Sequence, residues 1–341
     1  MPHRGNRAPA QGHESEVSAL TFLALRSLAD GRFHSGEDIA RSLNRSRATL
    51  SEALKRVPEL GVELFSVPGK GYRLAEPIEF LDAAAIDKRL GTVMPGVKLE
   101  IVDEIDSTST RLLALAAEGA PSGTCLAAEW QNSGRGRRGR TWISSLGGSL
   151  TFSLLWRFDR GAGHLAGLSL AVGEAVARAL AGCGVERVQV KWPNDVVSDF
   201  RKLAGVLVET SGEMQGPSVA VIGVGVNYRL GERALERIDQ AVTDIAQCAS
   251  PVPSRSHVLA ELLATLATSL EQFDRSGFAA SRDAWRALHA YQGRRVRVFA
   301  AHEAAFDAEV VDVASDGALV VSTAEGRVVN LASAEISLRT R

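Results

Sequence analysis

A run of glycine and arginine at residues 134–142, GRGRRGRTW, is the segment best suited to hold an anion. Glycine leaves backbone N–H groups accessible, and guanidinium groups match the geometry of phosphate oxygens. The four arginines of the run are Arg135, Arg137, Arg138 and Arg140. The composition predicts a phosphate-binding loop. A solvated basic loop or a nucleic-acid contact would have the same composition, so these alternatives stay open.

The same run differs by one substitution from a Walker A loop, because residues 134–141 read G-x-x-x-x-G-R-T. A Walker A loop must open a helix whose N-terminus binds the phosphates. Here the following residues, TWISSLGGSLTFSLLWRF, contain paired glycines and then a strand pattern, and the lysine is absent. We therefore exclude a P-loop.

A second charged cluster lies in KWPNDVVSDFRKLAGVLVE, residues 191–209. Pro193, Asn194 and Asp195 predict a sharp turn after a strand, which places Lys191 beside Asp195. Lys202 begins the next strand and is expected at the same end of the hairpin. Two lysines and one carboxylate there suit an anion site with one metal ligand, although a surface hairpin with solvated charges fits equally.

Glycines also interrupt the apolar strand AVIGVGVN, residues 220–227. Gly223 and Gly225 match the beginning of a dinucleotide fingerprint, but Tyr228 stands where its third glycine belongs and no helix follows. Glycine within a strand indicates that something packs closely on the backbone.

GRGRRGR, KWPNDV, KLAGVLVE and GVGVN occur together, in this order and spacing, in the biotin protein ligases. DEIDSTST at 103–110 and EWQNSGRG at 129–136 are also similar to that family. The block FHSGEDIARSLNRSRATL…VPGKGYRL resembles the repressor-type members, which bind biotin-operon DNA. The resemblance extends from about residue 17 to the C-terminus.

This resemblance implies two half-reactions. Biotin and ATP first form biotinyl-5′-AMP, and the lysine amine of an acceptor, the biotin carboxyl carrier protein of acetyl-CoA carboxylase, then displaces AMP. Both steps bring anions together, so cations and backbone donors must supply most of the catalysis. The expected ligands are ATP, biotin and Mg²⁺.

Matching of the motifs assigns a role to individual residues. Biotin is expected against Ser107, Thr108, Ser109 and Gln131, although the family usually has asparagine at position 109. Arg135, Gly136 and Arg137, with Arg138 and Arg140, are expected to fold over the ligand. Catalysis is assigned to Lys202, Arg137, Lys191 and Asp195, with Asp195 the candidate Mg²⁺ ligand, while Trp142 would cover the adenine with Asn227 nearby.

Residues 16–76 predict a winged helix-turn-helix domain: helical spacing is followed by helices capped at Ser35 and Ser46 and by a hairpin wing. Residues 1–73 hold eleven Lys and Arg against eight Asp and Glu. Glu52 stands where repressor-type members often have a basic residue, and winged helices also bind proteins. The expected DNA contacts are Arg45, Ser46, Arg47, Thr49 and Lys55.

The remaining chain predicts an α+β protein. Strand-like runs alternate with helices over residues 80–290, as expected for a mixed-sheet catalytic domain of the biotin/lipoate ligase type. Short strands over residues 291–341 predict a small SH3-like β-barrel. EPIEFLDAAAIDKRLG is expected to be a connecting helix, and residues 1–15 a disordered tail.

Composition narrows the class of protein. A net charge of -1 excludes a molecule that binds nucleic acid through overall charge, and three scattered cysteines suggest neither a disulfide framework nor a zinc site. No apolar run is long enough for a membrane span or signal peptide, so we expect a cytoplasmic protein. The resemblance also suggests a homodimer formed through the central sheet.

Two other functions stay open. A lipoate-type ligase of related fold would need a narrower, apolar tunnel. A non-catalytic, biotin-sensing DNA-binding regulator would have no need of Lys191, Lys202 and the arginine loop, all of which are present.

Overall fold

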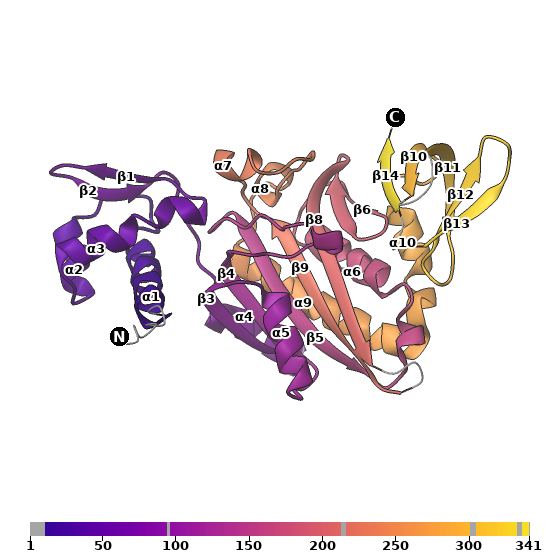
Figure 1. Cartoon of the computed structure of the whole chain (residues 1–341), viewed down its shortest axis with the longest axis horizontal. Coiled ribbons are helices and arrows are strands. Elements are labelled where there is room, and N and C mark those ends of the chain that lie inside the picture. Colours follow the sequence, from indigo (N-terminus) through magenta and orange to yellow (C-terminus); the bar gives the residue numbers. More distant parts are fainter. Residues whose placement is uncertain (1–10, 94–95, 213–215, 301–304, 333–335, 341) are drawn as a thin grey trace, which may run out of the picture. The chain divides into compact units, whose positions relative to one another are not determined.

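The computed structural model describes residues 11–93, 96–212, 216–300, 305–332 and 336–340. The chain divides into two units, residues 1–80 and 81–341 (Figure 1). The first unit holds helices α1 (Gln11–Ser27), α2 (Gly36–Ser42) and α3 (Arg47–Leu54), a 3₁₀ turn (Val57–Leu60), and the strands β1 (Leu64–Val67) and β2 (Gly71–Leu74). This is the predicted winged helix-turn-helix order. Residues 11–15, predicted as part of a disordered tail, belong to α1 instead, whereas residues 1–10 lie outside the described residues.

Serine caps begin both short helices of this unit, as the sequence predicts. Ser35 accepts a hydrogen bond from the backbone N–H of Asp38, and Ser46 accepts one from that of Thr49. The core is aliphatic and aromatic, and the Thr21 hydroxyl ties α1 to α3 by donating to the Ala53 carbonyl at 2.9 Å. The fully buried side chains of this core include Phe22, Leu25, Leu28, Leu50, Val57 and Leu60. The chain thus buries one face of each helix around a small shared core.

A seven-stranded sheet organises the second unit, in the order β3-β4-β5-β9-β8-β7-β6. The strands are β3 (Lys98–Ile105), β4 (Thr124–Gln131), β5 (Ser149–Phe158), β6 (Val188–Lys191), β7 (Asp195–Ser198), β8 (Arg201–Gly212) and β9 (Ser218–Asn227). Only β3 and β4 among these are parallel. The parallel pair is joined through α5 (Thr108–Ala117), the helix that such a connection requires.

Helices cover both faces of this sheet. Alternate residues of β4 point to opposite faces, so Cys125 and Ala127 join the cluster of α6 (Leu168–Gly182) and α9 (Arg255–Ser276), whereas Leu126 joins the cluster of α5. Figure 1 shows α5 across the sheet from α6 and α9. The short helices α7 (Glu232–Leu235) and α8 (Ile245–Cys248) follow β9. The predicted connecting helix is α4 (Ala83–Val93), which begins seven residues later than the predicted segment.

A fully buried ion pair fixes the beginning of the second unit. Arg255, at the start of α9, donates to Glu129 of β4 at 2.7 Å, and both side chains are completely buried. The second carboxylate oxygen accepts from the backbone N–H of Leu81, and the Arg255 guanidinium also reaches the Ser149 carbonyl. Since both charges are paired and hydrogen-bonded, loss of either partner would leave a buried charge, a change that typically costs about 3–5 kcal/mol.

The C-terminal strands form an antiparallel five-stranded sheet in the order β13-β12-β11-β10-β14. They are β10 (Arg295–Ala300), β11 (Phe306–Val313), β12 (Leu319–Thr323), β13 (Val328–Leu331) and β14 (Ile336–Thr340), and α10 (Arg282–Leu288) precedes them. The indole N–H of Trp192 donates to the Gly317 carbonyl at 3.0 Å. Gly317 has φ +84°, and a Cβ there would lie 2.8 Å from Gly167 Cα. The small sheet therefore packs in close contact with the segments next to β6 and α6 of the same unit.

Candidate active site

The glycine- and arginine-rich run of residues 134–142, called the arginine loop here, contacts the KWPND turn of residues 191–195. Arg137 donates to the Asn194 side-chain oxygen at 3.2 Å. Burial lowers the pKa of the Arg137 guanidinium and the adjacent charge of Arg138 acts in the same direction, whereas Asp195 opposes the shift. Residues more than fifty positions apart in the sequence thus form one charged site.

The hairpin from β7 to β8 places Lys202 against Asp195, with 2.8 Å between Nζ and Oδ1. A register shift between Val196 and Val197 of β7 accompanies this pairing. The two side chains are 18% and 19% exposed, so the pair is mostly buried but still accessible to solvent. A β-bulge at such a point redirects side chains beside a site.

Trp142 forms a wall of the same site. Its indole ring lies 5.8 Å from Lys202 Nζ and packs on the bare backbone of Gly225, where a Cβ would lie 2.6 Å from Cζ2. Gly205, paired with Gly225 across the strands, leaves room for Lys202 Nζ, which would be 3.2 Å from a Cβ there. The buried indole N–H of Trp142 has no hydrogen-bond partner among the described residues, so it is a donor available to a ligand.

A row of small polar side chains lies at the beginning of α5. The Gln131 side-chain oxygen accepts from the backbone N–H and the hydroxyl of Thr108 at 2.8 and 3.1 Å. Ser153 Oγ lies 2.8 Å from Thr108 Oγ1 and 3.0 Å from Ser109 Oγ. Ser107 caps α5 through the backbone N–H of Thr110. These buried donors and acceptors match a ligand head group that offers both kinds of atom.

Two glycines of β9 connect the polar row to the charged site. A Cβ at Gly223 would lie 2.5 Å from Ser109 Oγ, and one at Gly225 would overlap the Trp142 indole. The two glycines are two residues apart on one strand, so they share a face of the sheet. The backbone of β9 is therefore a floor shared by the polar row and the charged site. The glycines of this strand predict that another group packs closely on it, and Ser109 and Trp142 do.

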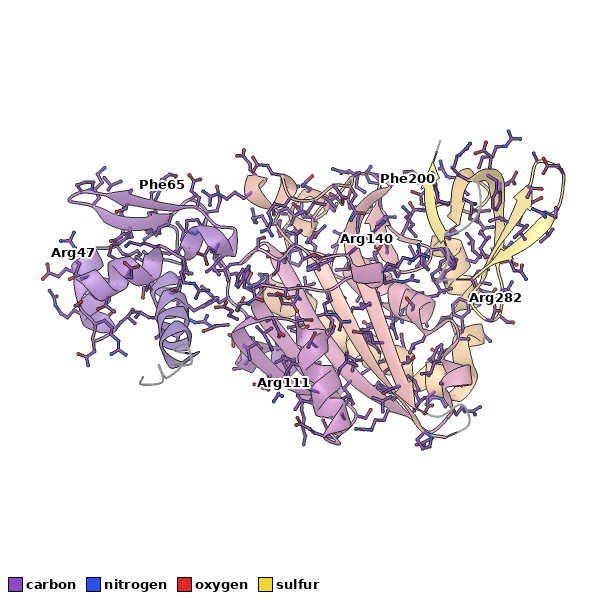
Figure 2. The ribbon with its side chains drawn as sticks, viewed as in Figure 1. Arg47, Phe65, Arg111, Arg140, Phe200 and Arg282 are labelled. Carbon is purple, nitrogen blue, oxygen red and sulfur yellow. The ribbon has the colours of Figure 1, made fainter. Side chains whose placement is uncertain are left out.

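The arginine loop also makes contacts of its own. Arg135 forms a two-point contact with Glu209 of β8, at 2.8 and 3.0 Å. The Gly136 N–H donates to the Arg140 carbonyl at 2.7 Å, and Arg138 has φ +57°. Arg140 is exposed on the segment between β4 and β5 (Figure 2). The Glu209 carboxylate thus pairs with Arg135, one of the arginines that the family resemblance assigns to the ligand.

Lys191 and Asn227 are placed as follows. Lys191 Nζ lies 5.6 Å from the centre of the Tyr291 ring. The Asn227 amide donates to the carbonyls of Lys202 and Thr243 at 3.1 and 3.0 Å, so it joins β9 to two neighbouring segments. Its expected proximity to adenine stays a prediction, and the visible role is to hold the backbone that carries Lys202.

Four residues in contact with this site were assigned no binding or catalytic role by the sequence: Ser153, Asn194, Glu209 and Tyr291. Asn194 joins the loop to β8, since its amide donates to the Val206 carbonyl at 2.9 Å. Glu209 was visible in the sequence only as the end of KLAGVLVE. Residues that contact a site from a distant strand can be recognised only when the pairing of the strands is known.

The expected Mg²⁺ contact at Asp195 stays a prediction. The described residues contain no group of three or more His, Cys, Asp or Glu side chains that would hold a metal ion. Asp195, the expected ligand, is already paired with Lys202. We therefore assign no chemical step to Mg²⁺.

In the N-terminal unit, Arg45, Ser46 and Arg47 line an open hollow together with Glu37, Arg41 and Asn44. Ser46 and Thr49 hydroxyls are bonded to each other at 2.8 Å, and Lys55 pairs with Glu52. Arg47 projects from the beginning of α3 (Figure 2). Arginines thus gather at the N-terminus of the expected recognition helix, while Lys55 is partly neutralised.

The two units define a class, a mixed-sheet ligase domain with a helix-turn-helix domain before it. Residues 101–227 match the biotin/lipoate A/B protein ligase family, and residues 19–73 match a helix-turn-helix domain. The bifunctional ligase/repressor BirA of Salmonella typhimurium is 36% identical over 94% of this chain and 97% of its own length. The chain therefore belongs to the bifunctional biotin ligase/repressor family.

Other comparisons agree with this class. The biotin–[acetyl-CoA-carboxylase] ligase of Mycobacterium tuberculosis is 32% identical over 66% of this chain and 83% of that protein. The structure of the biotin protein ligase of Aquifex aeolicus in complex with biotin and ATP superposes with a TM-score of 0.61, at 28% identity, over 72% of this chain and 99% of that one. Among the described helices, none has the length and apolar character needed to cross a membrane.

Proposed function

We propose that this chain is an ATP-dependent biotin protein ligase that forms biotinyl-5′-AMP and transfers biotin to a lysine of the biotin carboxyl carrier protein, in the cytoplasm. The observation that carries the proposal is the Arg137 loop meeting the Lys202–Asp195 pair above a glycine floor shared with the Thr108–Gln131 row. An acid that is adenylated needs a head-group site and a phosphate site on one surface, and this arrangement supports the assignment of both.

In the first half-reaction, a carboxylate oxygen of biotin attacks the α-phosphorus of ATP, and the bond to the bridging oxygen breaks to release pyrophosphate. Two anions must approach each other for this bond to form. The ammonium of Lys202 and the guanidinium of Arg137 offset that charge in a partly buried setting, where electrostatic interactions are stronger than in water.

In the second half-reaction, the amine nitrogen of the acceptor lysine attacks the acyl carbon, the bond to the AMP oxygen breaks, and the nitrogen gives up a proton. We assign Lys191 and Asp195 to orient the phosphate or to assist deprotonation of the incoming amine, with the Asp195 carboxylate as the group able to accept the proton. The arginine loop would retain the adenylate between the two steps, because Arg137 is anchored to Asn194 of the turn.

Incubation of the purified chain with ATP, an isolated biotin carboxyl carrier domain and either biotin or lipoate tests this proposal. We expect the carrier to gain one biotinyl group, measured by mass spectrometry, and to gain nothing with lipoate. Lipoyl transfer would favour the related lipoate-type ligase. Failure of both acids to react would leave a biotin-sensing regulator without catalysis.

We also propose that the N-terminal unit binds biotin-operon DNA and represses transcription. The arginines beside α3 support this, and a relative named ligase/repressor aligns with 94% of this chain, which includes a helix-turn-helix match over residues 19–73. Phosphate contacts release counterions, so each one adds a slope of about −0.9 to a plot of log affinity against log salt. We expect specific binding, measured by fluorescence anisotropy, to fall steeply with salt, and Arg47→Ala to reduce the slope by about one. Equal affinity for scrambled DNA would contradict the proposal.

A homodimer formed through the central sheet, promoted by the adenylate, belongs to the same proposal. Sedimentation of the chain with and without biotin and ATP would measure it.

A further inference from the structure

The aromatic ring of Tyr291 contacts the charged site from a part of the chain outside every motif. Tyr291 follows α10, immediately before the C-terminal sheet, and is 3% exposed. Lys191 Nζ lies 5.6 Å from its ring centre, within the range of a cation–π contact. Asp195 is close enough to add to the effect of burial in raising the pKa of the phenol. The ring therefore borders the end of the hairpin that carries Lys191 and Asp195.

The backbone around Tyr291 is fixed against the strand that carries Lys191. His289 forms a parallel bridge with Val190, and the N–H of Ala290 donates to the Val190 carbonyl at 3.0 Å. This short segment extends the seven-stranded sheet beyond β6. Because Val190 immediately precedes Lys191, the contact between ring and ammonium follows from paired backbones and not from two flexible side chains.

Other rings fix the orientation of Tyr291. Phe200, at the turn between β7 and β8 (Figure 2), meets it edge to face at 5.5 Å. The His289 ring lies tilted at 6.1 Å from the Tyr291 ring and is itself stacked on Trp285 at 4.5 Å. Edge-to-face and stacked rings of this kind define a rigid arrangement. The face that Tyr291 offers to Lys191 is therefore held by the protein interior.

We propose that Tyr291 is a positioning residue that holds the Lys191 ammonium beside Asp195, where the substrate phosphates bind. The inference rests on the proposed ligase function. Lys191 has four rotatable bonds, and an ammonium held over an aromatic face loses less freedom when phosphate arrives. Positioning of Lys191 requires the aromatic face of Tyr291 and does not require its hydroxyl group.

A double-mutant cycle tests this, with kcat/KM for ATP read from biotin-dependent ATP–pyrophosphate exchange. We expect Tyr291→Phe to stay within about twofold of the wild type, and Tyr291→Leu to lose about tenfold with the KM for biotin unchanged. That loss corresponds to about 1.4 kcal/mol. In a Lys191→Met background, Tyr291→Leu should have almost no further effect, because its partner is gone.

The matched control is Phe273→Leu. Phe273 is as deeply buried as Tyr291, at 1% exposed, but its ring packs against Phe158 and His164 and not against the charged site. This substitution should leave the kcat/KM for ATP nearly unchanged. An equal loss in this control, or an equal loss from Tyr291→Leu with and without Lys191, would overturn the proposal. Absence of exchange in the wild type would instead reject the ligase function.

A second measurement is independent of activity. Lysines labelled by ¹³C reductive methylation keep their charge, and methyl groups over an aromatic face are shifted upfield in the proton spectrum. The Lys191 resonance, assigned by its absence from Lys191→Met, should show this shift in the wild type and in Tyr291→Phe and lose it in Tyr291→Leu. An unshifted wild-type resonance would overturn the contact itself.

Discussion

Lys202 combines three contacts that prepare it for an anion. Its ammonium pairs with Asp195 at 2.8 Å, faces the Trp142 ring at 5.8 Å, and extends from a backbone whose carbonyl accepts from Asn227. The side chain is 18% exposed, so it is accessible from the solvent although most of its surface is covered. A positive charge held in this way need not be reorganised when negative charge develops.

Removal of this charge should therefore abolish most adenylate formation. A unit-charge contact at about 4 Å with an effective dielectric near 20 is worth about 4 kcal/mol, or on the order of a thousandfold in rate. We expect Lys202→Ala to lose roughly that factor in biotin-dependent ATP–pyrophosphate exchange, with a normal circular dichroism spectrum. Lys98→Ala, at an exposed lysine of β3, is the matched control and should keep its activity. Near-normal exchange in Lys202→Ala would remove this residue from the mechanism.

At the scale of one element, β9 contributes a surface without side chains. Its glycines alternate with buried valines, so one face of the strand packs into the core while the other admits Ser109 and Trp142. Any side chain larger than hydrogen would occupy the space of those groups. This requirement explains a strand that combines strong β-forming residues with glycine, which by itself weakens strands.

Gly225→Ala should disturb the site while keeping the sheet. The new methyl would overlap the Trp142 indole, and the ring must move away from Lys202. We expect a decrease of roughly tenfold or more in kcat/KM for ATP in the exchange assay, with retained secondary structure. Gly231→Ala, where a Cβ would meet nothing within 4 Å, is the control. Unchanged kcat/KM in Gly225→Ala would show that the indole position is unimportant.

On the scale of the whole molecule, His289 lies where the catalytic sheet, α10 and the C-terminal strands join. It pairs with β6 through its backbone and stacks on the fully buried Trp285. Burial lowers the pKa of its imidazole to about 3. The folded protein therefore keeps this ring neutral at pH values where the unfolded chain protonates it.

Folding stability should consequently fall with acidity between pH 6.5 and 3. The unfolded state binds the extra proton in this window, so stability contributed by the neutral ring is present above pH 6.5 and is lost as the pH falls. We expect His289 to account for about 2 kcal/mol of the loss in unfolding free energy between pH 7 and pH 5, measured by urea denaturation. His289→Phe retains a ring that can stack on Trp285 but cannot be protonated, so this variant should lose the His289 contribution to the pH dependence of the unfolding free energy. An unchanged pH dependence in this variant would contradict the assignment.

The repeating patterns of the chain were enough to predict the elements. Ser35 and Ser46 cap the helices expected of them, and the strand pattern that follows the paired glycines at 147–148 is β5 (Ser149–Phe158). Helix caps and alternation depend on neighbours close in sequence, so they are readable without a structure. Residues 11–15 were misread because a polar segment gives no apolar face by which to recognise a helix.

The types of residue in the site were likewise fixed by the chain alone: the arginine loop, the lysines of 191 and 202, and the glycines of β9. Their partners were decided by tertiary structure. Ser153 joins Thr108 to Ser109, Glu209 takes up Arg135, and Tyr291 faces Lys191, all across strand pairings or chain distances of more than forty residues. Contacts of this length depend on the order of strands in a sheet, and that order minimises the energy of the whole core, which no local pattern records.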